Sequence, residues 1–218
     1  MEVPYTNPGD AIQLYMRVEK IPGFFNYDDA QHFQLVLRMQ TLMGVTGDLL
    51  EIGSWQGRSA SFMSFYIQPG EKLIVSDVFS TPANDVYPEY PSVEDVKANI
   101  IKTNPNIAVS QLMFLEGNSA SMKLPPDVNI RFAHVDGGHS FQECYQDLIN
   151  IAPRMIPNGV VVIDDYDHPD WPEVKPATDT WLKEHLQFRI LGELNRDVAK
   201  GKKLYLINTA SDNHNDPR

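Results

Sequence analysis

The clearest chemical pattern in the sequence is an acid followed by two glycines. In "DLLEIGSWQGRSA", residues 48–60, a short apolar run carries Glu51 and ends at Gly53, and Gly57 and Ser59 follow. A strand that turns into a helix on two glycines lets a ligand approach the backbone closely. The spacing E-x-G-x-x-x-G-x-S departs from the G-x-G-x-x-G dinucleotide fingerprint, so a pyrophosphate cradle is incomplete. An acid here suits a ligand with an amino group, and a plain strand-to-helix turn is the alternative.

The elements that position this turn follow from the hydrophobic pattern. Apolar runs alternate with helical repeats after Gly47, which predicts βαβ units and a parallel sheet. The runs lie at 48–52, 72–76, 111–115, 130–135 and 159–163, with helices near 57–67, 92–104, 140–155 and 173–186. Two further runs, 187–194 and 203–208, are joined by "NRDVAKG" and predict an antiparallel pair at the sheet edge.

Two helices are expected before the sheet, at 9–20 and 27–44, the second capped by Asn26 or Asp28. We therefore divide the chain into an N-terminal helical extension or lid (1–46), a sheet domain (47–209) and a flexible tail (210–218).

A second acid limits the kinds of ligand that fit this turn. Asp77 ends the next apolar run, in "LIVSDVF", where a carboxylate can accept hydrogen bonds from ribose hydroxyls. An ordinary loop aspartate is the alternative. Together, Glu51 and Asp77 indicate a ligand with a ribose and an amine but no phosphate, and S-adenosylmethionine fits that description.

The chain resembles class I S-adenosylmethionine-dependent methyltransferases, and among them the macrocin O-methyltransferase-like family of sugar and natural-product O-methyltransferases. The matching segments are "LLEIGSWQGRSA", "LIVSDVF", "FLEGNSA", "FAHVDGGHSFQECYQDL" and "IPNGVVVIDDYDHPDWPEV". The resemblance implies an α/β Rossmann-like methyltransferase fold. Its sheet would have seven mostly parallel strands with an antiparallel last strand, and helices on both faces.

The resemblance also implies which residues bind the cofactor. The methionine part would lie against Glu51, Gly53, Ser54, Gly57 and Ser59. Asp77 would bind the ribose, and Asn118 and Ser119 would lie beside the adenine. The family often has Asp where this chain has Asn118, and an Asn side chain can still donate and accept hydrogen bonds.

Three carboxylates are expected just beyond the cofactor's methyl group. Asp136 ends the fourth run, and Asp164 and Asp165 end the fifth, which is its neighbour in the implied sheet. Such a cluster raises the pKa of its members unless a cation joins it, and oxygen ligands favour Mg²⁺ or Mn²⁺. The resemblance places a metal at these three residues, with Asp136 also facing the cofactor. Turn and helix-capping aspartates are the alternative.

His139 is the expected general base, because an imidazole titrates near neutral pH and the family has a histidine in this role. A structural histidine at a helix start is the alternative. His134 and Cys144 are expected in the core, and His168 on the surface or against the substrate.

The methyl acceptor is the least specified part of the prediction. The stretch at 80–95 and the segment at 19–29 are expected to form walls or a lid over the site. Four aromatic residues could stack on a sugar or phenol ring or could equally be surface residues: Tyr87, Tyr90, Tyr166 and Trp171.

The amino-acid composition argues against several classes of protein. The formal net charge of −11 argues against nucleic-acid binding, and the single cysteine against an internal disulfide. Without a signal-peptide pattern or a long apolar run, we expect a cytoplasmic protein away from the membrane that could form a homo-oligomer.

The sequence predicts an S-adenosylmethionine-dependent, Mg²⁺-assisted O-methyltransferase acting on a small hydroxylated molecule. A nicotinamide-dependent oxidoreductase and a non-catalytic protein of the same fold are the alternatives.

Overall fold

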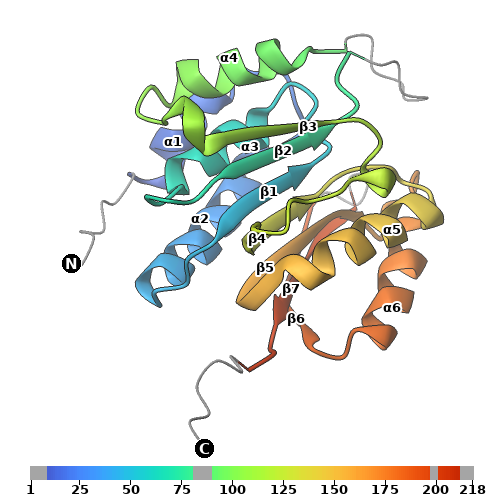
Figure 1. Cartoon of the computed structure of the whole chain (residues 1–218). Helices are drawn as coiled ribbons and strands as arrows, with labels where there is room; N and C mark the ends of the chain where they lie inside the picture. The colour runs from blue at the N-terminus through green and yellow to red at the C-terminus, as the bar shows by residue number, and fades with distance from the viewer. Residues whose placement is uncertain (1–8, 81–89, 197–200, 212–218) are drawn as a thin grey trace, which may run out of the picture.

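The alternating runs form a seven-stranded sheet in the computed structural model, which describes residues 9–80, 90–196 and 201–211. The strand order is β3-β2-β1-β4-β5-β7-β6 (Figure 1). The strands are β1 (Asp48–Ile52), β2 (Leu73–Asp77), β3 (Leu112–Glu116), β4 (Ile130–Val135), β5 (Met155–Tyr166), β6 (Phe188–Asn195) and β7 (Lys202–Asn208). The α-helices are α1 (Ala11–Val18), α2 (Tyr27–Leu42), α3 (Arg58–Met63), α4 (Val93–Thr103), α5 (Phe141–Ile151) and α6 (Val174–Glu184). Short 3-10 turns are η1 (Ser64–Tyr66), η2 (Val109–Gln111), η3 (Ser119–Ser121) and η4 (Ala152–Arg154).

The pairing of the strands confirms the predicted fold class. Strands β1 to β5 pair in parallel, and β7 lies antiparallel between β5 and β6. Strand β5 is longer than the run at 159–163, because Asn158 takes a positive φ of 61° within the strand instead of ending it. The connection at 197–200 and the tail beyond 211 lie outside the described residues. Strand β1 sits between β2 and β4, and this reversal of strand order opens a crevice at the carboxyl ends.

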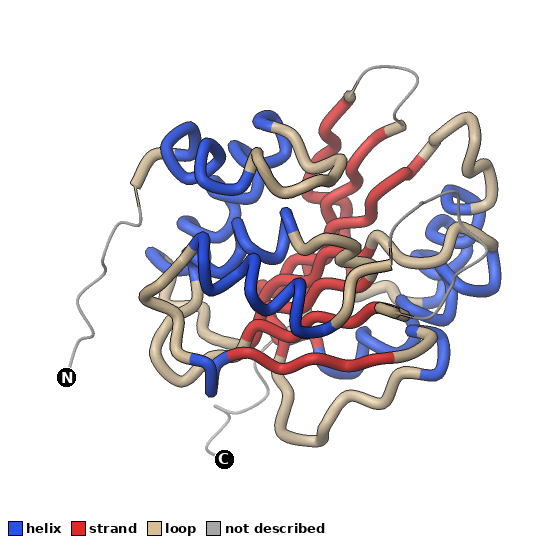
Figure 2. Tube along the Cα trace, turned by 90° about the horizontal axis from the view of Figure 1, so that it is seen from above, coloured by secondary structure: helices blue, strands red, loops and turns tan. Residues whose placement is uncertain are grey.

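Helices cover both faces of the sheet, as Figures 1 and 2 show. One apolar core contains Leu49 and Phe132 with side chains of α1 to α4, and the other contains Leu50 and Ala133 with side chains of α5 and α6. Successive strand residues therefore enter opposite cores, as parallel strands buried on both faces require. No helix in the described part of the chain is both long and apolar enough to cross a membrane.

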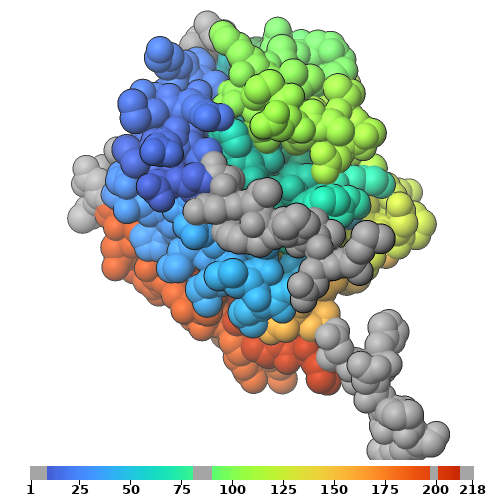
Figure 3. Space-filling view, turned by 90° about the vertical axis from the view of Figure 1, so that its left-hand side faces the viewer, coloured from blue at the N-terminus to red at the C-terminus, as the bar shows by residue number. Residues whose placement is uncertain are grey.

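The N-terminal helices share the first core with the sheet. Leu14 of α1 and Phe33 of α2 are fully buried in it, and both helices lie at the surface shown in blue in Figure 3. The loop between α1 and α2 is tied to the start of α3 by the Arg58 guanidinium, which donates hydrogen bonds to the carbonyls of Glu19 and Phe25 at 3.0 and 3.1 Å. This contact holds the loop over the carboxyl ends of the strands.

Helix α5 begins at a defined place because Ser140 caps it. The Ser140 hydroxyl accepts the Glu143 N–H at 3.3 Å, and the Glu143 carboxylate accepts from Ser140 in return, which completes a capping box. Helix α2 begins in the same way on Asn26, which confirms one of the two predicted caps. Since the α5 cap directly follows His139, it also fixes the end of the loop that carries that histidine.

Helix α5 buries an acid against the turn after β4. Asp147 is fully buried, and a Cβ on Gly137 would lie 2.6 Å from its Oδ2. Burial raises the pKa of Asp147 to about 7, with a smaller contribution from Glu143, while the Ser119 hydroxyl offsets part of the rise. The folded protein therefore keeps a proton on Asp147 at pH values where the unfolded chain has lost it.

The raised pKa predicts a pH-dependent stability. The free energy of unfolding that Asp147 contributes is complete below the unfolded pKa near 3.8 and is lost as pH rises through about 7. The side chain introduced by Asp147→Asn would not titrate. As pH rises from 4 to 8, the free energy of unfolding of Asp147→Asn should therefore increase by ~2–4 kcal/mol relative to that of wild type. Urea unfolding at several pH values measures this difference.

Asp127→Asn is the matched control, because its side chain is 69% exposed and faces only Lys72. A constant difference between Asp147→Asn and wild type across this pH range would contradict the prediction.

Candidate active site

A cavity opens at the carboxyl ends of β1, β2, β4 and β5, where the strand order reverses. The loop between α1 and α2 and the residues just before α4 form its outer walls. Most of the predicted site residues line it: Gly53, Ser54, Ser59, Asp77, Asn118, Ser119, Asp136, His139 and Asp164. Further lining residues include Phe24, Phe25, Trp55, Arg58, Tyr90, His134, Glu143 and Lys203.

The turn after β1 needs its two glycines for backbone reasons. Gly53 has a φ of 80°, and a Cβ there would lie 1.8 Å from the carbonyl oxygen of Asp136. Gly57 has a φ of 79°, and a Cβ there would lie 2.7 Å from Val96. Gly53 lets the turn pass against the end of β4, and Gly57 begins α3 without lining the cavity itself.

Asp77 fastens this turn to the end of β2. Its Oδ2 accepts the Trp55 N–H at 2.7 Å and the Ser54 hydroxyl at 3.3 Å, and its Oδ1 accepts the Val78 N–H at 2.7 Å. These three donors, with the Phe79 N–H at 3.4 Å from Oδ1, hold the carboxylate in one orientation at the cavity wall. Asn118 similarly accepts the Ala120 N–H at 2.8 Å at the end of β3, beside Ser119.

Glu51 lies behind the cavity wall rather than in it. The side chain is fully buried, and its Oε1 accepts from Nδ1 of His134 at 2.8 Å. Its carboxylate is turned toward β4, so the methionine contact expected for Glu51 stays a prediction. His134 is buried, as predicted, but it also reaches the cavity.

The consecutive acids Asp164 and Asp165 face different partners. Asp164 accepts hydrogen bonds from Lys203 and Arg196, and its Oδ1 also accepts the Asp165 N–H at 2.8 Å. Burial opposes the charge, but the Lys203 ammonium and the Arg196 guanidinium hold the pKa of Asp164 well below its ordinary value. Asp165 takes a positive φ of 53°, which turns the chain at the end of β5 and separates the two side chains.

Asp165 and Trp171 fix the ring of His139. Nε2 of His139 lies 3.1 Å from Oδ2 of Asp165, and its ring stacks on Trp171 with centroids 4.1 Å apart and an interplanar angle of 13°. Because an ionised carboxylate only accepts, the geometry assigns the proton to Nε2 and leaves Nδ1 able to accept another.

Asp136 differs from the other two acids. It lines the cavity, and burial, with repulsion from Asp164 and Asp165, raises its pKa well above the ordinary value, although Lys203 offsets part of the rise.

The predicted metal set does not come together as one group in the described residues. Asp136 groups with His134 and Asp164 on one side and with His139 and Asp165 on the other, the donor atoms of each group lying within 4.8 Å of one another. Both oxygens of Asp164 already accept hydrogen bonds from cationic side chains. The residues therefore do not fit a magnesium site made of Asp136, Asp164 and Asp165.

The remaining residues singled out from the sequence differ in whether they reach the cavity. Tyr90 lines the cavity, whereas the Tyr166 hydroxyl donates to Asp179 at 2.8 Å, away from it. Tyr87 lies outside the described residues. Cys144 is buried as predicted, and burial raises its pKa to about 12, so it does not act as a nucleophile.

Sequence reasoning missed the two cations of the site, Lys203 and Arg196. Lys203 stands at the second position of β7 and Arg196 just beyond β6, where charged residues normally face solvent. The one available signal was the excess of acids expected at this end of the sheet, which requires buried cations.

Comparison with known proteins adds a family and a set of similar folds. The family profile described as "Methyltransferase domain" matches residues 50–166. The O-methyltransferase NovP is 15% identical, with a TM-score of 0.69 over 92% of this chain and 100% of that one. CalS11, a TDP-rhamnose 3'-O-methyltransferase of calicheamicin biosynthesis, is 20% identical, with a TM-score of 0.60 over 90% of each chain.

TomG of Streptomyces achromogenes, an O-methyltransferase of tomaymycin synthesis solved in complex with SAM, is 13% identical, with a TM-score of 0.61 over 92% of this chain and 88% of that one. No curated protein sequence matches the chain.

Proposed function

The chain belongs to the methyltransferase-domain family, and we propose that it transfers the methyl group of S-adenosylmethionine to a hydroxyl oxygen of a small molecule. The observation that carries this proposal is the His139–Asp165 pair at the cavity that the glycine turn borders. A family match to a methyltransferase domain also removes the reason to prefer a nicotinamide-dependent oxidoreductase.

The chemistry of the lining supports S-adenosylmethionine as the ligand. The cofactor carries a sulfonium and an ammonium, and four acids line the cavity: Asp77, Asp136, Glu143 and Asp164. Asp77 would bind the ribose hydroxyls, the turn at Gly53 and Ser54 with Ser59 the methionine part, and Asn118 with Ser119 the adenine. Glu51 would act through His134, and Gly57 through the start of α3.

The reaction asks two tasks of the protein, which are to remove the proton of the acceptor hydroxyl and to hold the base in place. When bound, the sulfonium supplies a methyl carbon whose bond to sulfur breaks, with the electron pair left on sulfur, as the acceptor oxygen attacks. His139 takes the hydroxyl proton on Nδ1, because Asp165 holds the other ring nitrogen. Trp171 keeps the imidazole in one plane, so the acceptor meets a base of fixed orientation.

The acceptor we propose is a sugar, a glycoside or a phenolic natural product. Phe24 and Trp55 stack with centroids 6.0 Å apart, and both border the cavity together with Tyr90. Such aromatic faces suit the apolar face of a sugar or a phenol ring. The naming of CalS11 as a sugar O-methyltransferase is consistent with this class. A methyl-transfer screen over sugars, glycosides and phenols tests it, and methylation of amines alone would contradict it.

Asp77→Ala should weaken the binding of S-adenosylmethionine by ~10- to 100-fold, because a charged hydrogen bond lost from a buried site costs ~1.5–3 kcal/mol. Isothermal titration calorimetry measures the dissociation constant. Glu116→Ala is the control, since Glu116 pairs with Asp77 in the sheet register but is exposed. An unchanged affinity in Asp77→Ala would remove Asp77 from the ribose role.

His139→Ala should lower turnover by ~10²–10⁴-fold, the usual contribution of a general base, with cofactor affinity unchanged. His168→Ala, in the same region but outside the cavity lining, should keep full turnover. Asp165→Asn should lower turnover when His139 is present and add no further loss in His139→Ala. A further loss in that double variant would mean that Asp165 acts on something other than His139.

A further inference from the structure

Two buried cations lie beneath the cavity, and the role proposed for His139 does not use them. Lys203 of β7 is 1% exposed, and Arg196 beyond β6 has a side chain that is 6% exposed. Both side chains are largely removed from bulk water, so protein groups must balance most of their charge. Asp164 is the acid that both of them bind.

Lys203 is held by partners from two strands. Its ammonium donates to Asp164 of β5 and, at 2.9 Å, to Nε2 of His134 on β4. His134 can accept there because its Nδ1 donates to Glu51 at 2.8 Å. A continuous chain of hydrogen bonds thus runs from β1 through β4 and β7 to β5, with the positive charge at the cavity floor.

Arg196 completes the charge balance on the other side of Asp164. Its guanidinium binds Asp164, lies 3.5 Å from Oδ1 of Asp165 and lies 3.9 Å from Oδ2 of the buried Asp29. Each oxygen of Asp164 therefore faces a cation, Oδ1 toward Arg196 and Oδ2 toward Lys203. A divalent ion bound to Asp164 would have to displace one of the two cations that already bind its oxygens.

We propose that Lys203, with Arg196, is the resident cation of this site and that methyl transfer by this chain needs no divalent metal. The inference rests on the proposed function for its catalytic part, and its metal-binding part rests on the occupied oxygens of Asp164. In this arrangement Lys203 is a positioning residue. It binds Asp164 and supplies positive charge at the cavity floor, near which the acceptor oxygen loses its proton.

The first test uses the wild-type protein. After treatment with EDTA it should show no stoichiometric Mn²⁺ binding by electron paramagnetic resonance at submillimolar Mn²⁺, and added Mg²⁺ should not raise its turnover. One tightly bound Mn²⁺ per chain, or turnover that EDTA abolishes and Mg²⁺ restores, would overturn the proposal.

The second test removes the cation. Lys203→Met keeps an unbranched side chain that is one atom shorter and uncharged. It removes one positive charge from the neighbourhood of Asp136, Asp164 and Asp165. We expect turnover to fall ~100-fold, in line with the loss of one electrostatic contribution to the transition state, and Mn²⁺ binding to appear. Failure of Lys203→Met to gain Mn²⁺ binding while it remains folded would contradict the replacement of a metal by Lys203.

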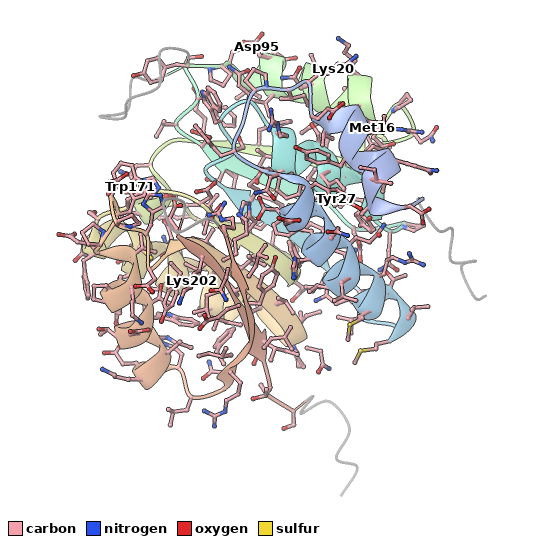
Figure 4. The ribbon with its side chains drawn as sticks, turned by 180° about the vertical axis from the view of Figure 1, so that it is seen from behind. Met16, Lys20, Tyr27, Asp95, Trp171 and Lys202 are labelled. Carbon is pink, nitrogen blue, oxygen red and sulfur yellow. The ribbon has the colours of Figure 1, made fainter. Side chains whose placement is uncertain are left out.

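Lys202→Met is the matched control. Lys202 precedes Lys203 in β7 (labelled in Figure 4), and its pairs with Asp167 and Glu193 at 3.3 and 3.5 Å lie at the surface. It should bind no Mn²⁺ and keep wild-type turnover. Calorimetry with S-adenosylmethionine separates the two proposals. If the wild-type protein does not bind the cofactor, the proposed function is refuted. The Mn²⁺ measurements would still show whether Lys203 or a divalent ion is the cation of the site.

Discussion

Carboxylates gathered at the carboxyl ends of parallel strands can stay ionised only if the protein supplies matching charges and donors. This constraint organises the site. Asp164 is neutralised by Lys203 and Arg196, Asp165 is left to hold His139, and Asp77 is satisfied by backbone N–H groups. Burial and repulsion from Asp164 and Asp165 act on Asp136, and Lys203 offsets only part of them, so the pKa of Asp136 is the one that rises. Three acids that look equivalent in the sequence thus have three different electrostatic environments, and each environment suits a different task.

The sheet topology makes these environments possible. Strand β1 lies between β2 and β4, so the glycine turn, Asp77 and Asp136 meet at one end of the sheet. The contact is so close that only Gly53 lets the turn pass the carbonyl of Asp136. Strand β7 enters antiparallel between β5 and β6 and brings Lys203 under the acids of the parallel strands. The cofactor side and the cation side of the site therefore depend on the same central strands.

Much of this architecture can be predicted from local pattern. Alternating apolar runs located the strands, Asn26 was foreseen as a cap, and the glycine turn and Asp77 followed from their places at strand ends. The partners of the acids could not be predicted in this way. Lys203 binds an acid 39 residues earlier, and His134 binds Glu51 across 83 residues. Which charge a buried acid meets depends on strand register and side-chain direction, and a lysine at the start of a strand reads as a solvent-facing residue until the register is known.

The order of the acids and the cations along the chain has a consequence for biosynthesis. A ribosome delivers Asp29, Glu51, Asp136 and Asp164 well before Arg196 and Lys203. Until β7 inserts between β5 and β6, the nascent sheet holds an excess of buried negative charge and lacks a central strand. Completion of the sheet and neutralisation of the site are then a single late event. A nascent chain therefore has no complete site while β7 is still inside the exit tunnel.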